Sequence, residues 1–210
     1  MTEQALREAM CRAGRLLWER GLVGASEGNL SARLEDGSIL CTPSGGSKGH
    51  LEPESLVVLD PGGRPVDGGR PSSEIRLHLR ALARRPDCGA VVHAHPPTAT
   101  AFAVAGRTIP DDVLPEAMIV LGPVALIPFA MAGTDALPDA MEDAFPKHKT
   151  FLLGHHGAVT LGRDLEDAVQ RMETLERIAV VLMRAEALGG AKPLPAEAFE
   201  ALKHHLHGRL

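Results

Sequence analysis

Two histidines stand two residues apart at the end of an apolar run, in the segment Gly89-Ala-Val-Val-His-Ala-His95-Pro-Pro97. Small and β-branched residues lead into His93 and His95 and two prolines follow, a pattern that predicts a buried strand ended by a breaker. Because side chains alternate along a strand, both imidazoles point to the same face. Such a pair can bind a metal ion. The alternative is two independent histidines, one hydrogen-bonded and one solvated.

A third histidine, His156, is the best candidate to complete a metal site. It follows a second predicted strand, in Gly154-His-His-Gly157, and its neighbour His155 is expected to point elsewhere if the backbone is extended there. Three neutral imidazoles leave Zn²⁺ with its full double charge and a fourth position for substrate or for a carboxylate, which we assign to Glu74. The same ligand types accept Co²⁺ or Mn²⁺ as substitutes. The alternative is a set of unrelated histidines.

Two loops rich in glycine and serine could bind an anion such as phosphate. In Ser26-Glu-Gly-Asn-Leu-Ser31, Gly28 permits an unusual backbone angle and Asn29 can bond neighbouring amides. The segment Thr42-Pro-Ser-Gly-Gly-Ser-Lys-Gly49 can present backbone N–H groups, although its spacing is not that of a Walker motif. The alternative for the first loop is a plain turn.

A third anion-binding candidate is the start of the helix that follows Arg70-Pro-Ser-Ser-Glu-Ile75. Ser72 or Ser73 is expected at its N-cap and Glu74 in its first turn. The helix macrodipole favours negative charge at this position, both for a carboxylate and for a bound phosphate. The alternative is ordinary helix-start chemistry with no ligand.

The composition of the chain limits the classes of function. The chain has 210 residues, 44% of them apolar and 23% charged, which is ordinary for a globular domain with one core. Its net charge of −5, without a basic stripe, argues against nucleic acid as the main partner. No apolar run reaches membrane-spanning length, and three cysteines without metal-like spacing predict reduced thiols in a cytoplasmic protein. The chain contains no tyrosine, so none of its own can act in the chemistry.

Apolar periodicity and turn signals predict helices and strands along the whole chain. Helices are expected over residues 3–20, from 75 onward, and over 98–105, 136–145, 165–188 and about 195–206. Strands are expected over 30–34, 39–42, 56–60, 89–95, 124–128, 150–153 and 158–161. The turn Glu35-Asp-Gly-Ser38 predicts a hairpin between the first two strands. We therefore expect a single α/β domain over residues 1–210, with a central, mainly antiparallel sheet flanked by helices.

Five motifs together resemble the zinc-dependent class II aldolase/adducin-domain family, and within it the L-fuculose-phosphate aldolases. They occur in the family's order and spacing: Ser26-Glu-Gly-Asn-Leu-Ser31, Thr42-Pro-Ser-Gly45, Pro71-Ser-Ser-Glu74, Val92-His-Ala-His95 and His155-His-Gly157. The likeness covers nearly the whole chain. It implies an α/β domain around a central antiparallel sheet, assembled as a homotetramer with sites near the subunit interfaces.

The resemblance also implies roles for individual residues. His93, His95 and His156 would bind zinc, and Glu74 would be a zinc ligand that doubles as the catalytic acid/base. A further set of residues would hold the substrate phosphate: Ser26, Gly28, Asn29, Ser44, Gly45, Ser72 and Ser73.

The implied reaction is the cleavage of a ketose 1-phosphate, of the L-fuculose 1-phosphate kind, to dihydroxyacetone phosphate and an aldehyde. Zinc would stabilise the negative charge of the enediolate, and Glu74 would move a proton at the nucleophilic carbon. One alternative is a sugar-phosphate dehydratase of the methylthioribulose-1-phosphate type on the same zinc scaffold. Another is a non-catalytic assembly module, as in adducin, against which the retained histidines and Glu74 argue.

One departure from the family pattern concerns the aldehyde. Family aldolases use a tyrosine near the subunit interface to handle the proton on the aldehyde oxygen, and the matching position here is Ala117. They also have a tyrosine near the C-terminus, which this chain lacks. Aldehyde recognition and that proton step therefore do not carry over. Ribulose-phosphate 4-epimerases typically have Asp where Glu74 stands, which counts against that activity.

Overall fold

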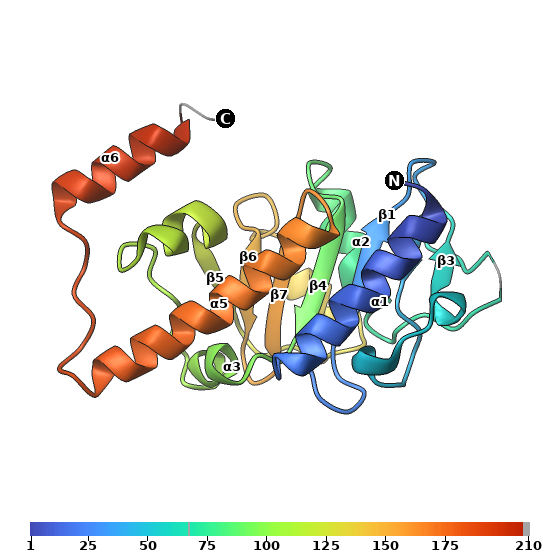
Figure 1. The fold of residues 1–210 in the computed structure, drawn as a ribbon, viewed down its shortest axis with the longest axis horizontal. Coiled ribbons are helices and arrows are strands. Elements are labelled where there is room, and N and C mark those ends of the chain that lie inside the picture. The colour runs from blue at the N-terminus through green and yellow to red at the C-terminus, as the bar shows by residue number, and fades with distance from the viewer. Residues whose placement is uncertain (67, 208–210) are drawn as a thin grey trace.

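A seven-stranded sheet forms the centre of the molecule in a computed structural model that describes residues 1–66 and 68–207 (Figure 1). The strands lie in the order β3-β2-β1-β4-β7-β6-β5, and in this described part of the chain every pair except β5–β6 is antiparallel. Their bounds are β1 Asn29–Arg33, β2 Ile39–Cys41, β3 Val57–Leu59, β4 Ala90–Ala94, β5 Val124–Ile127, β6 Thr150–Leu153 and β7 Gly157–Gly162. The predicted α/β domain with a mainly antiparallel sheet is confirmed. Residues 67 and 208–210 of the predicted domain lie outside the described residues.

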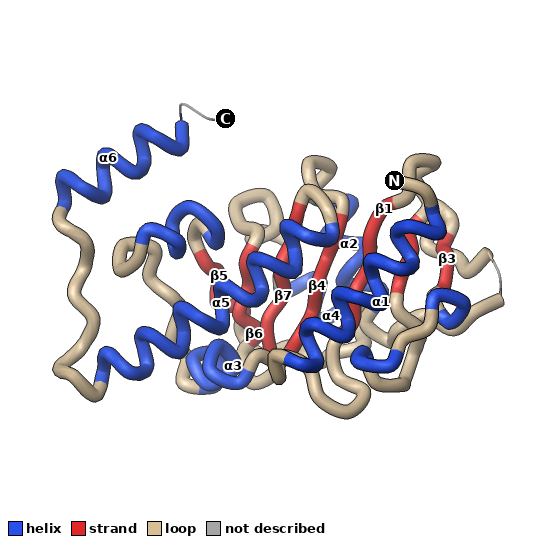
Figure 2. Tube along the Cα trace, in the orientation of Figure 1, coloured by secondary structure: helices blue, strands red, loops and turns tan. Residues whose placement is uncertain are grey.

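Helices pack on both faces of this sheet (Figure 2). On one face lie α1 (Glu3–Glu19) and α5 (Leu165–Glu186), and on the other lie α2 (Ile75–Arg84) and α4 (Ala136–Ala140). The remaining helical segments are α3 (Pro97–Val104), α6 (Ala196–His207), two 3-10 turns at Lys48–His50 and Pro53–Ser55, and a π-helical turn at Ala117–Leu121. In Figure 1, α6 stands away from the rest of the molecule. No helix of the described residues is long and apolar enough to cross a membrane.

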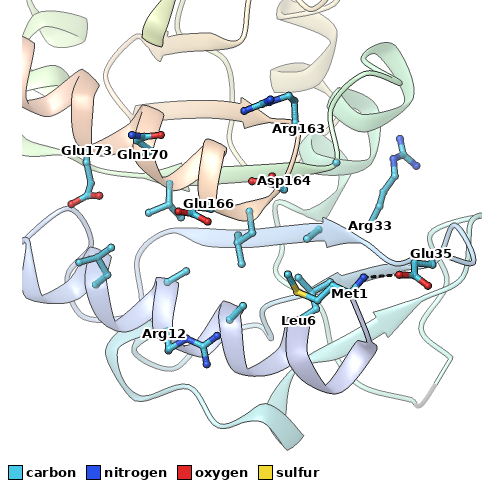
Figure 3. Close-up of a pocket in the computed structure, with 17 residues that line it drawn as sticks. Met1, Leu6, Arg12, Arg33, Glu35, Arg163, Asp164, Glu166, Gln170 and Glu173 are labelled. Atoms are coloured by element: carbon cyan, nitrogen blue, oxygen red, sulfur yellow. Dashed lines mark hydrogen bonds and ion pairs between the residues drawn. The ribbon is translucent and has the colours of Figure 1, made fainter. Parts of the chain in front are cut away.

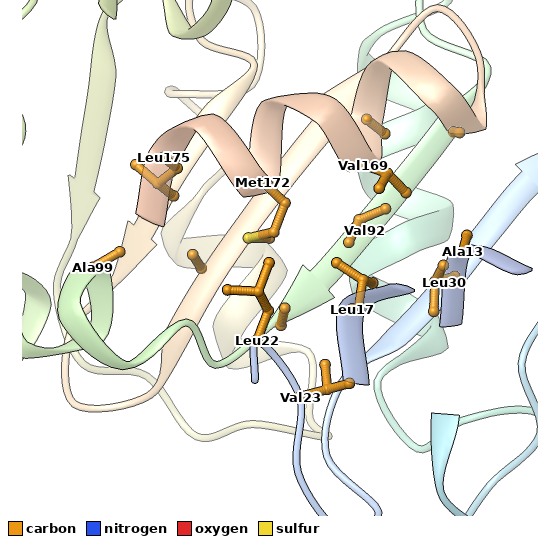
Figure 4. Packing of buried hydrophobic residues seen from close by; sticks show 14 of the residues in the cluster. Ala13, Leu17, Leu22, Val23, Leu30, Val92, Ala99, Val169, Met172 and Leu175 are labelled. Atoms are coloured by element: carbon orange, nitrogen blue, oxygen red, sulfur yellow. The ribbon is translucent and has the colours of Figure 1, made fainter. Parts of the chain in front are cut away.

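The central strand β4 is buried along its whole length, and its alternating side chains join two different cores. Val92 packs in the cluster under α1 and α5, where Figure 4 shows it beside Leu17 and Met172. Val91 points to the opposite face and packs in the cluster under α2 and α4. Burying one such side chain is worth about 1.5–3 kcal/mol. Because a one-residue slip would exchange the two faces, the cores fix the register of β4 and with it the direction of His93.

The local elements follow the predicted pattern with two differences. The hairpin is confirmed, since Leu34 N donates to Ser38 O at 2.8 Å and Gly37 has a φ of 88°. The helix predicted over 136–145 was too long, because α4 ends at Ala140 and turns carry the chain on to Phe145, which packs on Phe151. The π-helical turn was not predicted, because its apolar sequence has no helical period.

Candidate metal centre

The three predicted histidine ligands come from two adjacent strand ends. His93 lies in β4, paired with Asn29 of β1 on one side and Val159 of β7 on the other. His95 follows just past the end of that strand. His156 lies in the turn between β6 and β7, which His155 opens with a φ of 58°. That left-handed residue turns its own exposed side chain toward Phe129. His155 therefore points away from the cluster, although through a left-handed turn and not through the extended backbone that the prediction assumed.

The histidine nitrogens converge on one point. One ring nitrogen each of His93, His95 and His156 lies within 4.8 Å of the other two. The Nε2 atoms of His93 and His95 are 3.2 Å apart. A tetrahedral zinc ion with Zn–N bonds of about 2.0–2.1 Å would separate its ligand nitrogens by about 3.4 Å. The cluster therefore has the size of a divalent-metal site.

The backbone sets the tautomer of His93. Its Nδ1 lies 2.9 Å from the carbonyl oxygen of Ala158, which can only accept a hydrogen bond. Nδ1 therefore carries the proton, and the lone pair of Nε2 faces the cluster. On His95, Nδ1 lies 3.6 Å from Glu27 Oε1, so the same nitrogen, Nε2, faces inward.

Glu74 closes the cluster from the start of α2. Its Oε2 lies 3.2 Å from His93 Nε2, and its Oε1 lies 3.5 Å from His156 Nε2. The Oε1 atom is buried and has no hydrogen-bond partner, and neither has Nδ1 of His156. Buried polar atoms normally have partners. An oxygen left without a partner at the edge of the histidine cluster fits a cation at this point.

The protonation states suit metal binding. Burial alone would raise the pKa of Glu74, but the neighbouring His93 and His156 rings and the hydrogen bond from Asn29 hold it below its usual range. Burial, and after it the proximity of His93, lower the pKa of His156 to about 4 and also lower the pKa of His95. Near neutral pH, Glu74 is therefore ionised while His95 and His156 are neutral, as ligands must be.

Two glycines let the backbone approach the histidines closely. A Cβ atom on Gly157 would lie 2.6 Å from Ala94 O and 2.6 Å from His95 Cδ2. A Cβ atom on Gly28, which has a φ of 69°, would lie 2.7 Å from His93 O. Both contacts are too short for any side chain, so the geometry of the cluster depends on glycine at these positions.

The prediction that Ser72 or Ser73 would be the N-cap of α2 was wrong. Glu74 itself occupies the N-cap position, and its side chain makes no cap hydrogen bond. Ser72 lies two residues earlier, where its Oγ accepts from Glu74 N at 3.3 Å. The physical reason is that the Glu74 carboxylate turns toward the histidines instead of the helix amides.

A buried polar chain behind Glu74 was not predicted. Asn29 Nδ2 donates to Glu74 Oε2 at 2.9 Å, which leaves Asn29 Oδ1 to accept from Nε2 of His78. The other ring nitrogen of His78, Nδ1, then accepts from Ser31 Oγ at 2.7 Å. Burial lowers the pKa of His78 to about 3, so this imidazole is neutral. Both polar groups of the Asn29 side chain thus act inside the metal centre, and its phosphate contact stays a prediction.

The predicted phosphate loops are tied to one another. Ser44 N donates to Arg70 O at 2.9 Å and Ser72 N donates to Thr42 O at 3.2 Å, so the second loop lies against the start of α2. The side chain of Lys48 joins the first loop to the second. Three of the predicted phosphate-binding serines are exposed there: Ser26, Ser44 and Ser73. Gly45 has a φ of 74°.

A hollow lies elsewhere and is lined by none of these residues (Figure 3). It has a volume of about 590 Å³ and lies between the N-terminal halves of α1 and α5. Arg33 and Gly89 line it, and they stand at the ends of β1 and β4 opposite Asn29 and His93. The hollow is therefore separate from the histidine cluster.

The chain belongs to the family defined by the class II aldolase and adducin N-terminal domain, whose model matches residues 8–183. This confirms the family expected from the five motifs. Among curated relatives, the 3-oxo-tetronate 4-phosphate decarboxylase of Haemophilus influenzae is 36% identical over 85% of this chain and 87% of its own. A 5-methylthioribulose-1-phosphate/5-deoxyribulose-1-phosphate aldolase of Rhodospirillum rubrum is 37% identical over 93% of this chain and 88% of its own.

Solved structures agree with this assignment. YgbL of Klebsiella pneumoniae, described as a putative aldolase/epimerase/decarboxylase, is 33% identical and superposes with a TM-score of 0.88 over 96% of this chain and 99% of its own. An L-fuculose 1-phosphate aldolase is 28% identical, with a TM-score of 0.87 over 99% of this chain and 98% of its own. The relatives are enzymes with several different reactions on one scaffold.

Proposed function

We propose that this chain is a metal-dependent lyase that breaks a carbon–carbon bond next to the ketone of a phosphorylated sugar or sugar acid. The convergence of three imidazole nitrogens, with the unpartnered Oε1 of Glu74 3.5 Å from His156 Nε2, carries this proposal. His93, His95 and His156 would hold the cation, with Glu74 as a fourth ligand. Zn²⁺ suits this donor set best, and Co²⁺ or Mn²⁺ could replace it.

A bound divalent cation supplies Lewis-acid stabilisation of the negative charge that develops on the substrate oxygens. The protein residues do the rest. The Glu74 carboxylate stands at the cluster with one oxygen held by Asn29, and its Oε1 is free to take or return a proton at the reacting carbon. Residues Ser26, Gly28, Asn29, Ser44, Gly45, Ser72 and Ser73 would hold the phosphate and so orient the other end of the substrate.

The first candidate reaction is retro-aldol cleavage of a ketose 1-phosphate, of the L-fuculose 1-phosphate kind, to dihydroxyacetone phosphate and an aldehyde. In this reaction the carbon–carbon bond breaks as a base takes the proton of the hydroxyl group that becomes the aldehyde oxygen. At the position that matches the family tyrosine expected for this step, this chain has Ala117. Its methyl group is buried in the hydrophobic cluster under α5. The chain has no tyrosine at all.

The second candidate is decarboxylation of a 3-oxo sugar acid 4-phosphate, and the missing tyrosine favours it. Here the bond to the carboxylate breaks, CO₂ leaves, and the electron pair stays on the enediolate of dihydroxyacetone phosphate until a proton adds to the carbon. No hydroxyl proton has to be removed as the bond breaks. Relatives named as 3-oxo-tetronate 4-phosphate decarboxylases support this candidate. Both reactions pass through the same enediolate and share the product dihydroxyacetone phosphate, and they differ in the co-product.

Product analysis tests the proposal. Purified protein would be incubated with 3-oxo-tetronate 4-phosphate, L-fuculose 1-phosphate and 5-methylthioribulose 1-phosphate, and CO₂, aldehyde and dihydroxyacetone phosphate would be measured separately. We expect CO₂ and dihydroxyacetone phosphate from the first substrate. Chelation should abolish the activity, and added Zn²⁺ should restore it.

Matched variants give the controls for this experiment. Glu74→Gln should lose about 10²–10⁴-fold in rate, as expected for a positioned acid/base. His155→Gln changes the exposed neighbour of His156 and should keep the rate. Equal turnover after chelation, or an undiminished rate in Glu74→Gln, would refute the metal-dependent mechanism. A diketone formed from 5-methylthioribulose 1-phosphate without carbon–carbon cleavage would replace it with the dehydratase alternative.

The assembly and location of the protein are also proposals. We propose a homotetramer in the cytoplasm. The largely exposed α6 supports association, because a helix of about twelve residues is marginally stable on its own. The three cysteines, all within the described residues, form no disulfide, which suits a reducing compartment. Light scattering should give four times the chain mass of 22.2 kDa. A monomer would contradict the tetramer.

A further inference from the structure

Lys48 is the most deeply buried lysine side chain that bears on the candidate site, with 2% of its surface exposed. Lysine is almost never fully buried unless its charge is paired. Lys48 stands at the first position of the short 3-10 turn Lys48–His50, beneath two loops whose tips are exposed. Its ammonium group therefore needs an electrostatic explanation.

The contacts of Lys48 do not neutralise its charge. Its Nζ donates to the carbonyl oxygens of Ser26 and Gly46, both at 3.0 Å. Both acceptors are neutral, and no carboxylate of a described residue lies within 4.0 Å of Nζ. An ammonium group has three N–H donors, so one remains after these two bonds. A buried cation without a counter-ion is costly, because desolvation is not offset by an opposite charge.

The position of Lys48 relates it to the metal centre. Burial lowers the pKa of Lys48, and the negative charge of Glu74 works against that lowering, so the ammonium lies within the electrostatic reach of the Glu74 carboxylate. Ser26 and Gly46 belong to the two glycine-rich loops that were predicted to bind phosphate. The positive charge of Lys48 therefore lies between those two loops, without a carboxylate in direct contact.

We propose that Lys48 is the cationic contact for the phosphate group of the substrate. The inference rests on the proposed function, since it assumes a phosphorylated substrate at this site. A phosphate bound between the two loops would accept the third N–H of Lys48 and supply the missing counter-charge. Lys48 also connects the two loops when no ligand is bound, so its substitution could alter stability as well. The test must therefore compare the affinities of the variant for charged and uncharged ligands.

Calorimetric titration of three proteins tests this role. The wild type, Lys48→Met and Lys48→Arg would each be titrated with dihydroxyacetone phosphate, dihydroxyacetone and glycolate. Methionine keeps the length of the stem without the charge, and arginine keeps the charge. We expect Lys48→Met to bind dihydroxyacetone phosphate about ten- to a hundredfold more weakly, the range for one hydrogen bond to a charged group. Its affinity for dihydroxyacetone should stay unchanged, and Lys48→Arg should recover part of the loss.

Other outcomes overturn the inference. Equal affinity of wild type and Lys48→Met for dihydroxyacetone phosphate would refute it and leave the lyase proposal standing. So would an equal loss for dihydroxyacetone, which would show only a loop connection, or a selective loss for glycolate, which would make Lys48 a carboxylate ligand. If the wild type bound neither dihydroxyacetone phosphate nor inorganic phosphate, the proposed function would fail as well.

A measurement on the wild type covers the case that Lys48→Met does not fold. The chain has five lysines, so a ¹⁵N spectrum of the ammonium groups is simple to assign with Lys48→Arg. Inorganic phosphate should shift the Lys48 signal and leave those of Lys147, Lys149 and Lys192 in place. An unmoved Lys48 signal at saturating phosphate would contradict the contact.

Discussion

The two ends of the β1–β4 pair differ in chemistry. At the end with Asn29 and His93, polar side chains from several segments converge in a small space. At the end with Arg33 and Gly89, the hollow of about 590 Å³ has an apolar floor between α1 and α5 and charged residues at its rim (Figure 3). None of the three clustered histidines lines this hollow.

The difference lies in how well the polar groups are satisfied. In the hollow, the ion pair between the amino group of Met1 and Glu35 has side chains that are 57% and 80% exposed, so water already solvates both charges. Such pairs contribute little. At the other end, Glu74 Oε1 and Lys48 Nζ are buried and lack a complete set of partners in the protein. Unsatisfied buried groups are therefore what distinguishes the candidate site from the hollow.

The largest expected effect comes from removing a metal ligand. His93→Gln should lose the bound metal and reduce the rate by more than about a hundredfold. Even residues that only hydrogen-bond to metal ligands lower metal affinity or activity by about 10–100-fold when they are changed. Metal analysis of the purified variant together with turnover checks this. The exposed neighbour variant His155→Gln should keep both. A fully loaded, active His93→Gln would place the metal elsewhere.

A smaller loss should follow from crowding the cluster without touching a ligand. In Gly157→Ala, the new Cβ would meet Ala94 O and His95 Cδ2, both at 2.6 Å, and push the His95 ring from its position. We expect about 10–100-fold weaker metal binding, measured by competition with a chelator. Gly62→Ala meets only the flexible Asp60 side chain and serves as the control. Unchanged affinity in Gly157→Ala would show that the cluster tolerates a displaced His95.

The convergence of the three candidate ligands was predictable from the sequence because each depends on local chain geometry. Strand alternation places His93 and His95 on one face, and the turn between two strands presents His156. The sequence also predicted the α/β class and the hairpin. The strand order was not predictable from local patterns, since β1 lies between β2 and β4 through contacts that depend on how distant segments pair.

The residues around the ligands escaped prediction for the same reason. The bonds among Asn29, His78 and Ser31 join residues that are 47 and 49 positions apart, so they depend on how α2 packs on β1. Lys48 looked like part of a polar loop, and only the packing of α1 against the turn at Lys48–His50 buries it. The N-cap of α2 was wrong because a functional carboxylate took a position that helix rules give to serine.

The free energy of unfolding should depend moderately on pH because of the buried polar chain behind Glu74. The exposed rim of the hollow should make no such contribution. Burial lowers the pKa of His78 from 6.5 to about 3. Between these values the unfolded chain binds a proton that the folded chain does not. The stabilisation is therefore complete above pH 6.5 and is lost as the pH falls, by about 1.4 kcal/mol per pH unit for this group.

The variant His78→Gln isolates this contribution. Its amide can still donate to Asn29 Oδ1 but does not titrate. His95 and His156 also have lowered pKa values and act in the same direction, so the comparison is with the wild-type slope. Urea unfolding between pH 4 and pH 7 should show a shallower fall in the free energy of unfolding for the variant. Identical slopes would mean that His78 is not buried as a neutral group.

The smallest effect should come from the hollow itself. Arg12 and Gln170 line it and lie at the opposite end of the sheet from His93. Arg12→Ala and Gln170→Ala change exposed groups away from any buried network, so stability should stay within about 0.5 kcal/mol. Turnover and metal content should match the wild type. A fall in either quantity would show that the two ends are coupled through β1 and β4, and the distinction drawn from unsatisfied buried groups would then be too simple.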